Sequence, residues 1–317
     1  MKKLNLYINK YSIQMKRIKY PERRSEEYTT LMDDYKKIFK NNLQRMQTDW
    51  VKWQNNNKHL LGLRSVEDIL IADTDEIAEI YEEYNSYPNK ESNSVLELES
   101  LFKYDKYSSQ IADFFIRHAK DLDINTCYYC DMAYINVYSI QSKTNAKRQF
   151  DLDHFIPQSK CPILALSLFN FIPSCQVCNS RLKQDNIIGK DMNEWKKYNP
   201  AGKNYNFDQD VKIRLKINSL NAKDDDYSIK FERESNNYPI IDVLHLEERY
   251  DFHKAEAIRL KELKERYPTC VIRQLANMLT KSEGQIREDL YHEKFISQQG
   301  RCFSKLTRDI LADYKDY

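Results

Sequence analysis

Four cysteines near the middle of the chain have the spacing of a metal site. They form two CxxC pairs, Cys127 with Cys130 and Cys175 with Cys178. A CxxC turn directs two sulfur atoms at one ion, and two such turns complete the tetrahedron that structural zinc prefers. A redox dithiol would need only one CxxC, and disulfides form in oxidising compartments, for which no secretory segment is found. The spacing therefore predicts one structural Zn²⁺ per chain.

An acidic residue and a histidine lie side by side between the two cysteine pairs. Residues 150–156 mostly alternate between apolar and polar types, which is typical of a strand, and Pro157 cannot continue it. Asp153 and His154 therefore stand at a strand end, where neighbouring side chains face opposite ways. A carboxylate and an imidazole placed in this way can serve two different chemical groups.

The pattern CxxC…DLDHFIP…NFIPSCxxCNSRLK, within residues 127–183, resembles the HNH endonuclease superfamily in its zinc-ribbon form. The resemblance implies a ββα-metal core, in which a strand, a loop, a second strand and a helix surround one divalent cation. It implies that His154 is the general base and that Asp153 is a metal ligand. It also implies that Asn170 steadies the loop and orients the histidine, and that Asn179 is the second metal ligand.

The chemistry of phosphodiester hydrolysis fits these residue types. A neutral imidazole can take a proton from water, and a cation can polarise the phosphate and stabilise the leaving oxygen. Many HNH members carry His where this chain has Asn179, so its ligands are hard oxygens and favour Mg²⁺ or Mn²⁺. Arg181 and Lys183 could bind phosphates of the substrate, or they could simply form a solvated helix face.

Two functions fit the sequence. The first is a metal-dependent endonuclease that hydrolyses nucleic acid, with DNA favoured over RNA. The alternative is a zinc-ribbon module that binds nucleic acid or a protein without cutting, and it would need only the cysteines. The resemblance extends loosely to the nuclease subunit of bacterial antiphage systems such as Septu, and it then implies antiviral defence with a regulatory ATPase as partner.

Composition sets limits on partners and location. The chain of 317 residues has 50 basic and 48 acidic residues, so any basic surface must be local. It lacks an 18-residue apolar run and an apolar leader after its basic start, so we expect a cytoplasmic protein of a bacterium with no membrane contact. The flanking helices are expected to pack on the core, form a homodimer or bind a regulator.

The expected fold is α+β: a mainly helical chain with a central ββα-metal core, a four-cysteine zinc ribbon and an added β-hairpin. The expected segments are a helical domain at 1–122, the nuclease core with its ribbon at 123–200, the hairpin at 201–242 and a helical region at 243–317. Few glycines (5) and prolines (8) agree with a helical chain. The pattern predicts helices at 22–53, near Val66, at 74–84, 96–120, 179–184, 243–267 and after Pro268. It predicts a short N-terminal strand or ordered arm, strands at 133–140, 211–217 and 227–231, and a loop at 141–148.

Overall fold

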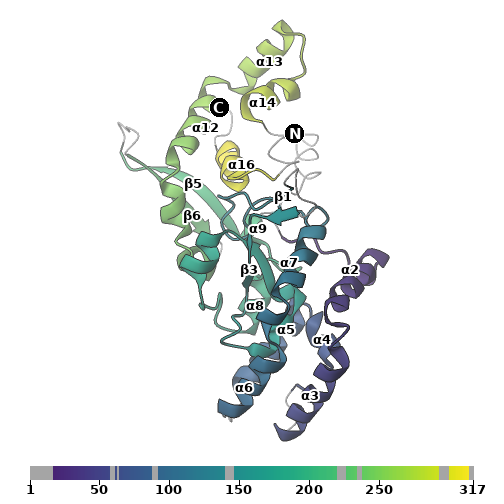
Figure 1. Ribbon diagram of the computed structural model, residues 1–317. Helices are drawn as coiled ribbons and strands as arrows, with labels where there is room; N and C mark the ends of the chain where they lie inside the picture. The colour runs from purple at the N-terminus through teal and green to yellow at the C-terminus, as the bar shows by residue number, and fades with distance from the viewer. Residues whose placement is uncertain are drawn as a thin grey trace. The chain divides into compact units, whose positions relative to one another are not determined.

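The computed structural model describes residues 17–57, 61–62, 64–87, 92–139, 146–219, 226–233, 238–292 and 300–313. Within them the chain is α+β, with many helices and three two-stranded antiparallel sheets (Figure 1). It divides into two compact units, which are described separately. One contains residues 17–129 and 135–205, and the other contains 130–134 and 206–317. Most of the strand or arm expected within the first twenty residues lies outside the described part, and residues 17–20 form neither a strand nor a helix.

The unit of residues 17–129 and 135–205 is built mainly from helices that begin where capping residues predict. Ser65 and Asp68 form a capping box, which confirms the helix expected near Val66, and Asp73 caps the next helix in the same way. The helices expected at 22–53 and 96–120 are each broken into two. Its helices are α2 Glu26–Lys36, η1 Lys37–Phe39, α3 Leu43–Asn56, α4 Val66–Leu70, α5 Thr74–Ser86, α6 Ser92–Leu101, η2 Tyr104–Lys106, α7 Ser108–Arg117, η3 Pro162–Leu166, η4 Leu168–Asn170, η5 Val177–Lys183 and α8 Met192–Tyr198.

The two breaks differ in their structure. The first helix ends in the tight turn η1, where the buried ring of Phe39 packs 4.8 Å from the ring of Tyr107. In the stretch expected as a helix at 96–120, Lys103 has an extended backbone (φ −62°, ψ 104°), so the helical hydrogen bonds stop there. The next turn begins at Tyr104. Apolar spacing alone would continue a helix through both stretches, so neither break could be predicted from it.

The helices hold the loop that joins two strands of the candidate site. Apolar side chains of the stretch expected as a helix at 22–53 belong to the core, since Tyr35 and Trp50 are fully buried. The Tyr35 hydroxyl donates to the carbonyl of Leu166 at 2.7 Å, and the Ser167 hydroxyl donates to the carbonyl of Ile69 at 2.7 Å. These bonds tie α2 and α4 to the last residue of η3 and the residue after it, so the helical flank fixes the loop from two sides.

Two of the sheets belong to this unit. Strand β1 Val137–Ser139 pairs with β2 Ala146–Arg148, and β3 Asp151–His154 pairs with β4 Phe171–Ser174. The first strand is shorter than expected. A loop was expected at 141–148. Its last residues, 146–148, instead form strand β2, because they pair with β1, and residues 141–145 lie outside the described part.

The other unit contains the predicted β-hairpin. Strands β5 Val211–Ile217 and β6 Tyr227–Arg233 are antiparallel, and their alternating apolar side chains are mostly buried, which confirms the expected pattern. The helices α11 (Leu246–Asp251), α12 (Lys254–Arg266) and α16 (Ser304–Asp313) pack on these strands. No helix in the described part of the chain combines the length and apolar character that crossing a membrane would take. The unit's helices are α9 Phe207–Asp210, α10 Pro239–Val243, α11 Leu246–Asp251, α12 Lys254–Arg266, α13 Thr269–Met278, α14 Glu283–Tyr291 and α16 Ser304–Asp313.

Candidate metal centre and hydrolytic site

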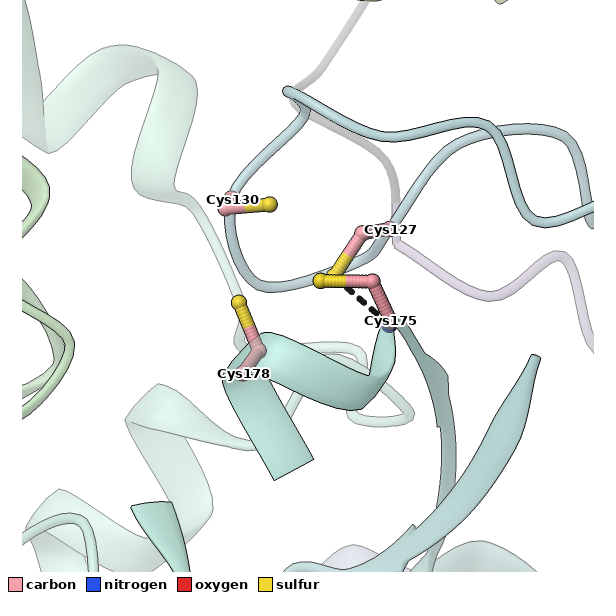
Figure 2. A group of neighbouring side chains, drawn as sticks. All are labelled: Cys127, Cys130, Cys175 and Cys178. Carbon is pink, nitrogen blue, oxygen red and sulfur yellow. Dashed lines mark hydrogen bonds between the residues drawn. The ribbon is translucent and has the colours of Figure 1, made fainter. Parts of the chain in front are cut away.

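The four cysteines predicted to bind zinc lie together. Figure 2 shows Cys127 and Cys130 on one loop facing Cys175 and Cys178 at the start of a helix, and the four sulfur atoms lie within 4.8 Å of one another. A tetrahedral zinc with Zn–S bonds of about 2.3 Å separates its sulfurs by roughly 3.8 Å, so a small contraction would close the shell. Three of the four side chains are buried, as a structural site requires.

Backbone amides donate to two of these sulfurs. The amide of Cys175 donates to Sγ of Cys127 at 3.3 Å, and the amide of Met132 donates to Sγ of Cys130 at 3.4 Å. Hydrogen bonds to a charged acceptor favour the charged form, which for cysteine is the metal-binding thiolate. The donor set and its surroundings therefore fit a structural Zn²⁺, and the cluster is a candidate zinc site.

The acid–histidine pair lies on a hairpin followed directly by a helix. Asp153 pairs with Ile172 and His154 pairs with Phe171 in the β3–β4 ladder. After β4 comes η5, whose wide π-type winding shows in the 2.8 Å bond from the Gln184 amide to the Asn179 carbonyl, five residues earlier. Such windings are rare and are frequent at functional sites. The order strand, loop, strand, helix expected from the sequence is present.

His154 is held on two sides. Its Nε2 lies 2.9 Å from the carbonyl oxygen of Ala165, and the rings of Phe171 and Tyr104 lie 4.8 Å and 4.9 Å from the imidazole. A carbonyl oxygen can only accept, so Nε2 carries the hydrogen and the neutral ring offers Nδ1 as an acceptor. Burial lowers the pKa of His154 to about 4. The half-buried imidazole is therefore neutral at physiological pH, with Nδ1 as its acceptor atom.

Asn170 holds the loop between the two strands. Its side chain is fully buried, and its Oδ1 accepts from the amide of Ile156 at 2.8 Å. Its Nδ2 donates to the carbonyls of Ile156 and Leu164, both at 3.0 Å. Leu164 immediately precedes the residue that binds the imidazole, so Asn170 positions the partner of His154 rather than the ring itself. These three bonds hold the loop between β3 and β4 in place.

Asp153 lies in a closed environment. Its Oδ2 accepts from the hydroxyl of Tyr129 at 2.6 Å, and its two oxygens lie 3.0 Å and 3.1 Å from Nζ of Lys183. Burial raises the pKa of Asp153 to about 6, and the lysine and tyrosine oppose this rise. The carboxylate is 3% exposed and both its oxygens have partners. As arranged, Asp153 does not fit the role of an open metal ligand that was expected for it.

The position of Lys183 also corrects an expectation. Its side chain is 0% exposed, and its Nζ donates to the carbonyl of His154 at 2.7 Å as well as to Asp153. A fully buried lysine with these partners is not available to a phosphate, because moving it would leave a buried carboxylate unpaired. Arg181, two residues earlier on η5, is exposed and keeps the role of a candidate phosphate contact.

The structure adds residues that sequence reasoning missed. Tyr104 comes from a helical segment outside the expected core, and nothing in its local sequence links it to His154. Tyr129 could have been noticed, since it lies inside the first CxxC turn. Asp151 could have been found from strand periodicity, because it shares a face with Asp153. Asn179, expected as a metal ligand, lies with its Nδ2 3.4 Å from Oδ2 of Asp151.

Comparisons of this chain with models of protein families, with curated proteins and with solved structures found no match. The arguments for its function therefore come from its own residues and geometry.

Proposed function

We propose that this protein is a metal-dependent HNH-type endonuclease that hydrolyses phosphodiester bonds of nucleic acid, DNA in preference to RNA. The observation that carries the proposal is the placement of His154. Its Nε2 is bound to the Ala165 carbonyl at 2.9 Å, which leaves Nδ1 as a proton acceptor at the end of a β-hairpin. A purely structural zinc ribbon gives no reason to hold a neutral histidine in this way.

The chain's own residues supply most of the chemistry. His154 accepts the proton of the attacking water at Nδ1, while Asn170 keeps the loop carbonyls at their positions. Arg181 binds a phosphate of the substrate from the exposed side of η5. A bound Mg²⁺ or Mn²⁺ supplies charge neutralisation at the phosphate and the leaving oxygen. The zinc-bound cysteines hold the hairpin and helix together and take no part in the reaction.

The test is cleavage by the purified full-length protein. Supercoiled plasmid, single-stranded DNA and tRNA are each incubated with Mg²⁺, Mn²⁺ or EDTA, and products are separated on gels. We expect cutting of DNA with Mg²⁺ or Mn²⁺ and none with EDTA. His154→Ala should abolish cutting but keep the fold and nucleic-acid binding, since a general base acts only in the chemical step.

The matched control is His253→Ala, because His253 is exposed and belongs to the other unit. This variant should cut like wild type. Cutting by His154→Ala at the wild-type rate would refute the assignment of the base, and cleavage of tRNA alone would replace DNA with RNA as the substrate.

A second candidate is a zinc-ribbon module that binds nucleic acid or protein without cutting. The observation that favours it is the closed state of Asp153, whose oxygens are bound to Lys183 and Tyr129. Binding of plasmid by the wild-type protein, with no cutting under any cation, would support this function over the nuclease. The proposed setting is bacterial antiphage defence, with an ATPase partner or a second copy of the chain as regulator; co-expression with a candidate ATPase would test it.

A further inference from the structure

Asp151 presents a carboxylate that the proposed chemistry has not used. It stands two residues before Asp153 on β3, so both side chains point to the face that η5 covers. Asp151 is half-buried, and it forms no ion pair with any residue that the structure describes. Its side-chain hydrogen bond there is the long 3.4 Å contact with Asn179. This carboxylate therefore has no ion-pair partner among the described residues at the hairpin–helix junction.

The neighbouring carboxylate has the opposite properties. Asp153 is 3% exposed, and its charge is balanced by the ammonium group of Lys183 at 3.0 Å. A divalent cation at Asp153 would have to displace a fully buried lysine, and removing one partner of a buried pair is strongly destabilising. A cation at Asp151 displaces only a weak amide contact.

Asn179 can turn an oxygen toward the same point. The two ends of an amide side chain are assigned from their surroundings, and a half-turn of this side chain would place Oδ1 where Nδ2 now lies, 3.4 Å from Oδ2 of Asp151. Two oxygens at this separation are close to the spacing of roughly 3 Å between adjacent ligands of a hard cation whose metal–oxygen bonds are about 2.1 Å.

We propose that Asp151 and Asn179, and not Asp153, are the protein ligands of a divalent cation, Mg²⁺ or Mn²⁺. Water fills the remaining positions in the free protein, as is usual for Mg²⁺ sites with one or two carboxylates. The inference rests on the proposed function only for the identity of the further ligand, a phosphate oxygen of the substrate. Asp153 and Lys183 then form a positioning pair that fixes the backbone of His154.

The experiment measures Mn²⁺ binding to the zinc-loaded full-length protein by electron paramagnetic resonance, without nucleic acid. Asp151→Asn should weaken Mn²⁺ binding by about tenfold or more. Asn179→Asp should tighten it, because a second carboxylate raises the charge of the ligand set. Asp185→Asn is the matched control, since Asp185 is exposed just beyond η5 and should have no effect. Zinc content and circular dichroism verify that each variant folds.

The inference is overturned if wild type binds no Mn²⁺, if Asp151→Asn binds it as wild type does, or if Asp153→Asn abolishes binding while Asp151→Asn does not. Because the readout needs no cleavage, the two proposals fail separately. Loss of Mn²⁺ binding in Asp151→Asn in a protein that cuts no substrate would support the cation site and refute the nuclease. Cutting by wild type with unchanged Mn²⁺ binding in Asp151→Asn would do the reverse.

Discussion

Replacing Lys183 by methionine tests the buried pair at the centre of the site. Methionine has nearly the same length and shape but no charge, so the change removes the ammonium group without opening a large cavity. It deletes the contacts to both oxygens of Asp153, at 3.0 Å and 3.1 Å, and the 2.7 Å bond to the His154 carbonyl. The carboxylate of Asp153 is then left buried, with Tyr129 as its remaining donor.

The expected cost is large. Removing one partner of a buried ion pair destabilises a protein by about 3–5 kcal/mol. For a unit of this size, about 1 kcal/mol changes the melting temperature by about 2–4 °C, so Lys183→Met should melt roughly 6–20 °C below wild type. Arg181→Met is the matched control on the exposed side of the same helix, and it should change the free energy of unfolding by less than about 0.5 kcal/mol.

The assay is thermal unfolding by circular dichroism, with zinc content measured on the same samples. The double variant Lys183→Met with Asp153→Asn removes both charges and should recover a substantial part of the lost stability, since the uncompensated buried charge causes most of the loss. If Lys183→Met melts within about 2 °C of wild type, the pair does not stabilise the fold and the reasoning fails. If the double variant is less stable than the single one, an unpaired charge is not the cause.

Three further outcomes follow from the structure. Elemental analysis should find about one zinc per chain, because four thiolates close the site. Cys175→Ser should lose the metal and melt at a lower temperature than wild type. A wild-type protein that contains no zinc, together with a Cys175→Ser variant that melts as wild type does, would contradict this. Tyr104→Ala should lower the rate of the proposed cleavage while leaving zinc content unchanged, because it removes a ring 4.9 Å from His154, and Tyr104→Phe should restore most of that rate. Equal rates for all three proteins would show that the ring does not position the proposed base. Partial burial acts to raise the pKa of Asp34, but hydrogen bonds from His118 and Arg117 lower it overall. The ionised Asp34 therefore stabilises the fold above the unfolded pKa of 3.8, and this contribution is lost as the pH falls through the lower folded pKa. Asp34→Asn should melt below wild type at pH 7, and the difference in melting temperature should shrink near pH 3.

Features whose physics is local could be predicted from the order of the amino acids alone. Two CxxC pairs predict a four-sulfur cluster because each turn fixes two ligands, and the sulfurs do lie together. Capping at Ser65 and the alternation in 211–217 predict a helix start and a strand because both depend on near neighbours. The order of strand, loop, strand and helix around Asp153 and His154 was expected from the resemblance to the HNH superfamily, and the described residues have this order.

The availability of each side chain for chemistry, in contrast, depends on long-range packing. The spacing of Asp153 and Lys183 gives no sign that they meet, because their contact depends on how η5 packs against β3. The same packing leaves Asp151 beside Asn179, and the break at Lys103 brings Tyr104 to the imidazole. Burial and pairing are properties of long-range contacts, so a sequence motif can name the candidate residues while the fold assigns each of them an open or a closed environment.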